Sequence, residues 1–365
     1  MTTDNTDAMP TAAPRVTDFA YPAFYRAMVE RERMQVSREE AVWSESGASP
    51  EEPVDVLLNF GCGVRQTPHL QREAVAVLEA LGVEFAAVAG QKYCCGKPYS
   101  SNGLKDAAKE IVSGSVQRME RFQPKRAIQW CSACEMQFKD LVQPDVGIEF
   151  SSDGIAEFLV ERIDELGDGI PWRTDVHVRA VVHGHLGEHP VRDGHPPIVM
   201  SLLQRIPGVE LIGLAESDAL DLCDNVGARI ATYGTEEYAA AQAALKGYLS
   251  GAGADTLVTM YHACTRELTK FADDELRIRH YISILAEALG VSKPDRFSQY
   301  WRMSDPAAIV EASRPNWESW GITEQEALLL AHKYFVPSYA ARAPECPCNG
   351  TCSRTGSDWL LPHGV

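Results

Sequence analysis

The sequence predicts an α/β protein built from two tandem, pseudo-symmetric modules, each a parallel sheet flanked by helices. Short apolar runs alternate with helix-like segments along most of the chain, a pattern typical of parallel strands joined by helices. The cysteine-bearing segments of the first half also recur in the second half at an offset of 129 or 130 residues, which indicates an internal repeat. We therefore expect a partly disordered N-terminal extension, a first module, a second module and a helical C-terminal region with a Cys-rich tail, over residues 1–53, 54–170, 171–290 and 291–365.

The elements of the first half follow from the spacing of apolar residues. A helix is expected over residues 21–33, where Phe24, Tyr25 and Met28 lie on one side. Three apolar runs predict buried strands, over residues 54–60, 83–88 and 126–130. Helices are expected over residues 68–81, 102–122 and 135–141. Thr67 is the expected N-cap of the first of these helices.

The second half repeats the same alternation. Strands are expected over residues 176–182, 209–214 and 256–260. Helices are expected over residues 197–206 and 236–249, with a closing helix over 279–289. The C-terminal region adds helices near residues 306–313 and 323–333.

The composition excludes several classes of protein. The 365 residues include 34 Lys and Arg against 51 Asp and Glu, a formal net charge of −17. This excess of negative charge disfavours binding to nucleic acid or to an anionic membrane surface. No stretch of about 20 residues is uniformly apolar, so no membrane span is expected. The first 17 residues lack the apolar core of a signal peptide, so a cytoplasmic location is predicted.

The chain has ten cysteines, and in a reducing compartment clustered cysteines are more often metal or redox ligands than disulfide partners. Each group in the first module follows a predicted strand, and the carboxyl ends of parallel strands meet at one edge of the sheet. Thiolates select zinc or iron–sulfur clusters, and five exceed the four that a tetrahedral zinc or an ordinary cubane needs. The spacing is C-x31-C-C-x35-C-x2-C, from Cys62, Cys94, Cys95, Cys131 and Cys134.

Two other interpretations of these cysteines carry less weight. Cysteines are common core residues, but packing alone would not place Cys-Cys-Gly and Cys-x-x-Cys segments at strand ends. The Trp130-Cys131-Ser132-Ala133-Cys134 segment resembles a thioredoxin redox motif. Three further cysteines at matching strand ends disfavour that interpretation, and no counterpart of the later cis-proline of that fold is evident.

The full spacing, with Gly96 after the paired cysteines, resembles the cysteine-rich Cys-Cys-Gly (CCG) domain. This domain occurs twice in the B subunit of heterodisulfide reductase and also in iron–sulfur subunits of glycolate and lactate oxidation complexes. The resemblance covers about residues 54–290. It implies that the five cysteines of the first module hold a non-cubane [4Fe–4S] cluster. At such a cluster a disulfide is split into two thiols by electrons that arrive one at a time from a partner chain.

The second module departs from the family pattern. When Cys223 is aligned with Cys94, Asp224 falls at the position of Cys95 and Tyr261 at that of Cys131. Two thiolates cannot easily hold a five-thiolate cluster. A mixed set of ligands for one zinc or iron is predicted instead, from His185, Cys223, Asp224, His262 and Cys264. The alternatives are a vestigial module kept for packing and for shaping a cleft, or an altered cluster.

Two weaker features remain. Four histidines lie in a segment rich in Gly and Pro and are either solvated or metal-binding: His183, His185, His189 and His195. The tail has metal-like C-x-C-x3-C spacing without a certain fourth ligand, so its thiols are either free or in contact with a metal or cluster: Cys346, Cys348 and Cys352.

The predicted function is that of an iron–sulfur oxidoreductase subunit acting on a small-molecule disulfide or thiol. Gly61-Cys62-Gly63 lacks the third glycine of a dinucleotide fingerprint, so electrons should not arrive directly as hydride. The resemblance implies flavoprotein and ferredoxin-like partner subunits. The alternatives are an electron-transfer subunit of a flavin-dependent hydroxy-acid oxidising complex, of the glycolate or lactate type, and a non-catalytic metal-binding scaffold.

Overall fold

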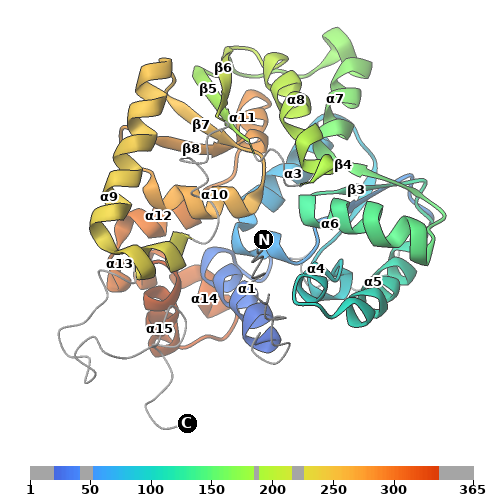
Figure 1. The fold of residues 1–365 in the computed structure, drawn as a ribbon, viewed down its shortest axis with the longest axis horizontal. Coiled ribbons are helices and arrows are strands. Elements are labelled where there is room, and N and C mark those ends of the chain that lie inside the picture. The colour runs from blue at the N-terminus through green and yellow to red at the C-terminus, as the bar shows by residue number, and fades with distance from the viewer. Residues whose placement is uncertain (1–19, 42–51, 185–188, 216–225, 337–365) are drawn as a thin grey trace, which may run out of the picture.

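Two four-stranded parallel sheets form the frame of the molecule (Figure 1). The computed structural model describes residues 20–41, 52–184, 189–215 and 226–336. Each sheet is flanked by helices, which confirms the predicted fold class. None of the helices in these ranges is both long enough and apolar enough to cross a membrane.

The first sheet has the strand order β2-β1-β3-β4. Its strands are β1 (Val56–Asn59), β2 (Phe85–Val88), β3 (Arg126–Gln129) and β4 (Ser151–Gly154). Its α-helices are α3 (Pro68–Ala80), α4 (Lys97–Ser100), α5 (Lys105–Glu120), α6 (Ser132–Gln137) and α7 (Ile155–Leu166). Short 3₁₀ helices are η1 (Gly63–Gln66), η2 (Gln91–Tyr93) and η4 (Gly167–Gly169), and η3 (Phe138–Val146) is a π-helix. Because all pairs are parallel, the loops after all four strands lie at one edge.

The second sheet repeats this topology with the order β6-β5-β7-β8. Its strands are β5 (Val178–His183), β6 (Val209–Ala215), β7 (Thr256–Thr259) and β8 (Arg277–His280). Its helices are α8 (Pro190–Gln204), α9 (Val226–Ala252), α10 (His262–Leu268), the 3₁₀ helix η6 (Thr269–Phe271) and α11 (Tyr281–Ala288). In both sheets the first strand of the module pairs with the second and the third, so the repeat of the sequence is also a repeat of the fold.

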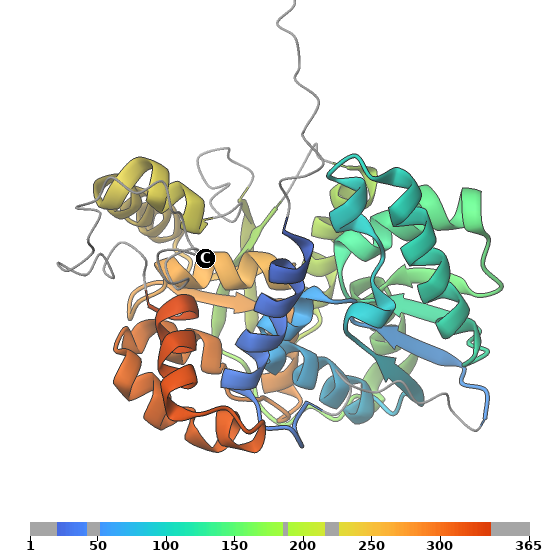
Figure 2. The same cartoon turned by 90° about the horizontal axis from the view of Figure 1, so that it is seen from below.

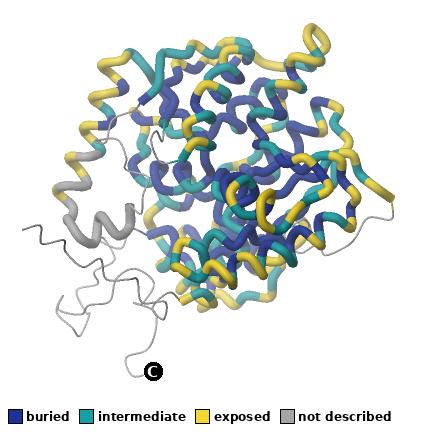
Figure 3. The backbone as a smooth tube through the Cα atoms, turned by 45° about the vertical axis from the view of Figure 1, so that its right-hand side comes forward, coloured by how far each residue is buried: buried dark blue, intermediate teal, exposed yellow. Residues whose placement is uncertain are grey.

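One hydrophobic core joins the modules. Helix α3 packs against α11, and α7 packs against α8. Leu58 and Phe60 of the first module therefore belong to the same buried cluster as Val181 and Ile282 of the second. Figure 3 shows buried backbone along the sheets and inner helices, with exposed residues on the outer turns. The modules bury their facing helices against each other, which places the strand-end loops of both near their common boundary.

The N-terminal helix α1 (Tyr21–Gln35) lies between the C-terminal helices and the first module (Figure 2). The C-terminal helices are α12 (Arg296–Met303), α13 (Pro306–Ala312), α14 (Arg314–Ser319) and α15 (Glu324–Tyr334). Met34 is buried among Phe297, Trp317 and Phe335, and Asn316 Nδ2 donates a 3.1 Å hydrogen bond to the Met34 carbonyl. The first and last parts of the described chain thus form one unit.

Several elements differ from the sequence-based expectations. Strand β4 and helix α7 were not predicted, because Ser151, Ser152 and Asp153 have no strand-like apolar pattern, although they pair with β3. The expected helix over residues 279–289 begins only at Tyr281, since residues 277–280 pair with β7 as strand β8. Thr67 precedes α3 as expected, but its side chain makes no capping hydrogen bond.

Candidate cluster site

All five cysteines of the first module meet at the carboxyl edge of its sheet. Cys62 follows β1, the Cys94–Cys95 pair follows β2, and Cys131 and Cys134 follow β3. Hydrogen bonds between thiols link them in the order Cys62, Cys94, Cys95, Cys134 and Cys131. None of these five forms a disulfide. The strand-end arrangement expected from the sequence is therefore present, and the role of these sulfurs as cluster ligands remains a prediction.

Buried polar side chains hold the loop that carries Cys62. Asn59 Nδ2 donates a 2.8 Å hydrogen bond to Gln129 Oε1, and Gln129 Nε2 donates a 3.1 Å hydrogen bond to Ser152 Oγ. The Gly61 amide in turn donates to Asn59 Oδ1 at 3.0 Å. Buried polar groups are retained at low cost when they are paired in this way, and this ladder sets the direction in which the chain leaves β1.

Two glycines let the backbone pass close to the cysteines. Gly61 has φ +64°, and a Cβ built there would lie 2.8 Å from Cys134 Sγ. Gly96, which follows the cysteine pair, has φ +80°, and its Cβ would lie 2.6 Å from the Ala108 carbonyl oxygen. Only glycine combines a positive φ with such close approach at small cost. The glycine of the Cys-Cys-Gly segment is thus explained by the packing of that loop on α5.

The thiols differ in their affinity for a proton. Hydrogen bonds from Cys62 and Cys95 lower the pKa of Cys94 to about 3. A hydrogen bond from Cys134 lowers the pKa of Cys131 to about 7, with further help from backbone amides and the positive charge of Arg192. A network in which some thiols donate and others accept favours thiolate at the accepting positions, and thiolate is the form that binds metal.

The donor set suits an iron–sulfur cluster. In the described part of the chain, no group of three or more His, Cys, Asp or Glu side chains, the five cysteines included, is arranged to hold a single metal ion, so the fit to a cluster rests on the type and number of the donors. Five soft sulfur donors are the ligand type that iron–sulfur clusters take. Cys94, Cys95 and Cys134 are buried, whereas Cys62 and Cys131, at the two ends of the series, are partly exposed.

A buried ion pair ties α1 to the turn after Cys62. Arg65 Nε donates a 2.7 Å hydrogen bond to Glu32 Oε2, and both residues are buried. Gln35 Nε2 donates to the Gln66 carbonyl at 3.0 Å on the next turn of the same helix. Helix α1 is therefore attached directly to the segment that carries the first predicted ligand.

Replacing Glu32 with Gln is expected to lower the free energy of unfolding by about 3 kcal/mol, because a buried arginine would lose its counter-charge. Glu30→Gln on the same helix is the matched control. Its carboxylate pairs with Lys333 at 2.9 Å and accepts a hydrogen bond from the Tyr334 hydroxyl. Because this pair is partly exposed and glutamine keeps an acceptor oxygen, the loss should stay near 1 kcal/mol. Urea denaturation of both variants measures the difference, and equal losses would contradict the assignment.

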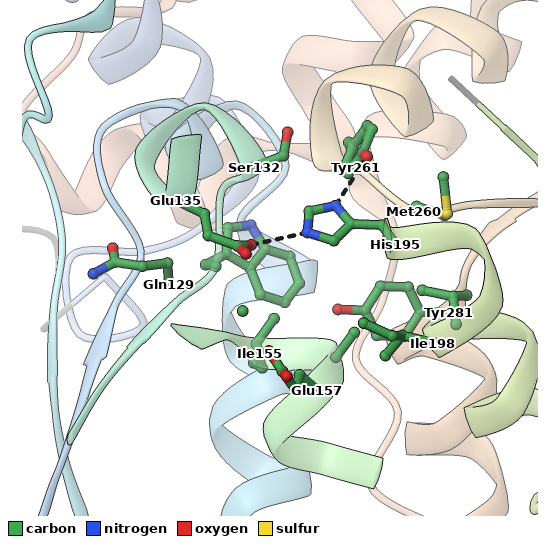
Figure 4. Close-up of a pocket in the computed structure, with 14 residues that line it drawn as sticks. Gln129, Ser132, Glu135, Ile155, Glu157, His195, Ile198, Met260, Tyr261 and Tyr281 are labelled. Atoms are coloured by element: carbon green, nitrogen blue, oxygen red, sulfur yellow. Dashed lines mark hydrogen bonds and ion pairs between the residues drawn. The ribbon is translucent and has the colours of Figure 1, made fainter. Parts of the chain in front are cut away.

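A small cavity lies between the modules, close to Cys131 (Figure 4). His195 of α8 bridges the boundary: its Nε2 lies 2.9 Å from Glu135 Oε2 and its Nδ1 lies 2.9 Å from the Tyr261 hydroxyl. Burial raises the pKa of Glu135, but the hydrogen bonds and positive charges of His195 and Lys139 together outweigh it and lower that pKa. The cavity holds about 30 Å³, enough for about two waters and far less than a small-molecule site requires.

Tyr261 occupies the place in the second module that Cys131 has in the first. The Arg192 guanidinium lies 5.4 Å from the centre of the Tyr261 ring, and its charge also lowers the pKa of Cys131. One cation of the second module therefore acts on both a predicted cluster ligand and the residue at its pseudo-equivalent position. The contacts of Arg192 and Tyr25 with the cysteine site were missed in the sequence, because both residues lie far from the cysteines along the chain. Glu135 directly follows Cys134, but its contact with His195 across the boundary could not be predicted from the sequence.

The predicted metal ligands of the second module are only partly visible. His185, Cys223 and Asp224 lie outside the described residues. His262 and Cys264 are buried on α10, and His262 Nε2 lies 2.7 Å from the position that a Cβ on Gly63 would take. His262 thus packs on the turn beside Cys62. A metal in the second module remains a prediction.

The histidine-rich segment does not gather into one group within the described residues. His189 Nε2 lies 2.8 Å from Asp140 Oδ2, whereas His195 contacts Glu135 and Tyr261. His183 is buried at the end of β5. The three tail cysteines, Cys346, Cys348 and Cys352, lie outside the described residues.

Residues 56–139 match the model of the CCG cysteine-rich domain. This segment holds all five clustered cysteines, so the chain carries a cysteine-rich domain of the CCG type. The chain is 25% identical over 275 residues to the D subunit of dihydromethanophenazine:CoB–CoM heterodisulfide reductase from Methanosarcina barkeri, covering 71% of this chain and 65% of the relative. It is 27% identical over 244 residues to the C subunit of anaerobic glycerol-3-phosphate dehydrogenase from Escherichia coli K12, covering 64% of this chain and 59% of that protein.

The chain is thus homologous to subunits of two oxidoreductases and spans about two thirds or less of their length. Among solved structures, an aspartate racemase homologue from Pyrococcus horikoshii OT3 is 10% identical and covers 64% of this chain and 96% of that protein, with a TM-score of 0.33. A likeness at this level carries no conclusion.

Proposed function

We propose that this chain is the iron–sulfur subunit of a heterodisulfide reductase-like complex and reduces a small disulfide to two thiols. The observation that carries this proposal is the convergence of five thiols at one sheet edge within a CCG domain. In the reaction the S–S bond breaks, and the two sulfurs take up two electrons and two protons. The heterodisulfide reductase relative is a D subunit. That this chain corresponds to the B subunit of such enzymes is part of the proposal.

The residues that hold the cofactor would be Cys62, Cys94, Cys95, Cys131 and Cys134. A non-cubane [4Fe–4S] cluster bound there would supply one-electron transfer to the substrate. The chain itself excludes water around the three buried cysteines and leaves access beside Cys62 and Cys131. Arg192, whose charge reaches Cys131, would favour a substrate sulfur that becomes anionic as the disulfide opens.

The electrons would come from partner subunits. The absence of a dinucleotide fingerprint in the sequence supports a flavoprotein and a ferredoxin-like subunit as donors, and the acidic charge of −17 would steer the chain toward a basic partner surface. A cytoplasmic location, where thiols stay reduced, belongs to the same proposal. For the second module we propose at most one zinc or iron, held by a set that includes His262 and Cys264.

A second candidate function is electron transfer without a substrate on this chain. It is favoured by the similarity to a glycerol-3-phosphate dehydrogenase subunit. In that case the cluster would pass electrons from a flavin-dependent oxidation to a further carrier, and no disulfide would react.

One experiment on anaerobically purified protein tests both functions. About four iron atoms and an equivalent amount of acid-labile sulfide are expected per chain, on the count of one cluster. With a reduced viologen as one-electron donor, the protein should reduce a small disulfide, and with NADH alone it should not. Iron without any disulfide reduction or disulfide-dependent EPR change would favour the second candidate. A colourless protein that contains only zinc would overturn both.

A further inference from the structure

The N-terminal helix places a phenol hydroxyl against a cysteine sulfur. The hydroxyl of Tyr25 lies 3.2 Å from Cys94 Sγ, although the two residues are 69 positions apart in the chain. Tyr25 is 8% exposed and Cys94 is 1% exposed, so water does not compete for this contact. The Gly96 amide donates to the same sulfur at 3.4 Å.

Helix α1 belongs to neither sheet, yet it is held firmly over the Cys94 side of the site. Tyr25, Met28 and Cys94 form one buried apolar cluster. The Tyr21 ring stacks on Tyr99 with centroids 4.2 Å apart and planes within 9°. On its other side α1 is joined to the C-terminal helices. The Tyr25 hydroxyl therefore has little freedom to turn away from the sulfur.

We propose that Tyr25 is a positioning residue that raises the reduction potential of the cluster by hydrogen bonding to the Cys94 sulfur. The inference rests on the proposed function, because it requires Cys94 to be a ligand. A thiolate bound to iron carries no proton, so the phenol must donate. The one-electron-reduced cluster carries one more negative charge than the oxidised cluster. A donor to the ligand sulfur therefore stabilises the reduced form more strongly.

The test is Tyr25→Phe in the cluster-containing protein, with the midpoint potential followed by EPR during a dithionite titration. The variant keeps the ring that packs in the apolar cluster and removes only the donor. The equilibrium constant for one-electron reduction should fall about tenfold, which corresponds to about 59 mV for a one-electron couple. Iron content should stay unchanged, which separates tuning of the potential from a merely structural role.

Tyr93→Phe is the matched control. Tyr93 is also buried and directly precedes Cys94, but the charged groups that affect it are Arg118 and Arg121 and not a cysteine. The midpoint potential of the cluster in the Tyr93→Phe variant should remain that of the wild type. A stronger donor, Tyr25→3,5-difluorotyrosine, should shift the potential upward. This variant decides the matter if Tyr25→Phe loses its iron.

The outcomes distinguish this inference from the proposed function. A wild-type protein without an iron–sulfur cluster would defeat the proposed function itself. A wild-type cluster whose potential is the same in Tyr25→Phe, or unmoved by difluorotyrosine, would overturn the inference and leave the function standing. Equal shifts in the Tyr25 and Tyr93 variants would also overturn it.

Discussion

Serine in place of Cys94 or Cys95 is expected to abolish the cluster, with iron falling from about four atoms per chain to near zero. Both sulfurs are buried, and they stand at the centre of the hydrogen-bonded series of thiols, where Cys94 contacts both Cys62 and Cys95. A hydroxyl is a harder and far less acidic ligand than a thiol. No other sulfur in the described site is free to replace them, because the remaining three follow other strands and are themselves predicted ligands.

The control is Cys264→Ser, the same change at a buried cysteine of the second module. Cys264 aligns with Cys134 in the repeat, but it is not part of the hydrogen-bonded series of five thiols in the first module. Iron should stay at about four per chain in this variant, and a proposed zinc in the second module should disappear. Full iron content in Cys94→Ser, or complete loss in Cys264→Ser, would show that the site has been assigned to the wrong module. Iron near eight in the wild type would place a second cluster in the chain.

Alanine at Gly61 is expected to lower the iron content at least severalfold, because two penalties coincide there. The residue has φ +64°, and a left-handed conformation costs a residue with a Cβ roughly 1–2 kcal/mol. The added methyl would also lie 2.8 Å from Cys134 Sγ, so the sulfur would have to move from the position that brings it to the other four. Iron analysis and the visible spectrum measure the loss.

Gly103→Ala separates the two penalties. Gly103 has φ +80°, but no atom lies within 4 Å of its added Cβ. This variant should lose stability by a similar roughly 1–2 kcal/mol from backbone strain alone and retain its iron. If both variants lost iron alike, backbone strain would explain the effect and the steric argument about Cys134 would fail.

Much of the site could be read from the sequence because its parts are local. The five cysteines lie within residues 62–134, and each follows an apolar run that is recognisable as a strand. Parallel pairing then brings the strand ends to one edge without further information. Gly96 is equally local, since its loop packs on the helix that begins a few residues later. The repeat in sequence likewise predicted two similar modules, and the two sheets have the same strand order.

Other elements were missed because their residues carry no pattern of their own. Strand β4 is polar and exists because β3 offers it a row of backbone partners. The start of helix α11 is set by the pairing of β8 with β7 and by His280, whose Nδ1 accepts a 3.2 Å hydrogen bond from the Ile282 amide. In both cases tertiary pairing outweighs local propensity.

The sequence by itself determined the fold class, the duplication and the set of five cysteines. Only the tertiary structure decided what surrounds them: Tyr25 on Cys94, Arg192 near Cys131, and His195 bridging Glu135 and Tyr261. The physical reason is that an apolar or polar face predicts burial or exposure of a helix but not its neighbour. Contacts between residues 60 or more positions apart depend on how the two modules and the terminal helices pack, and no local pattern records that packing.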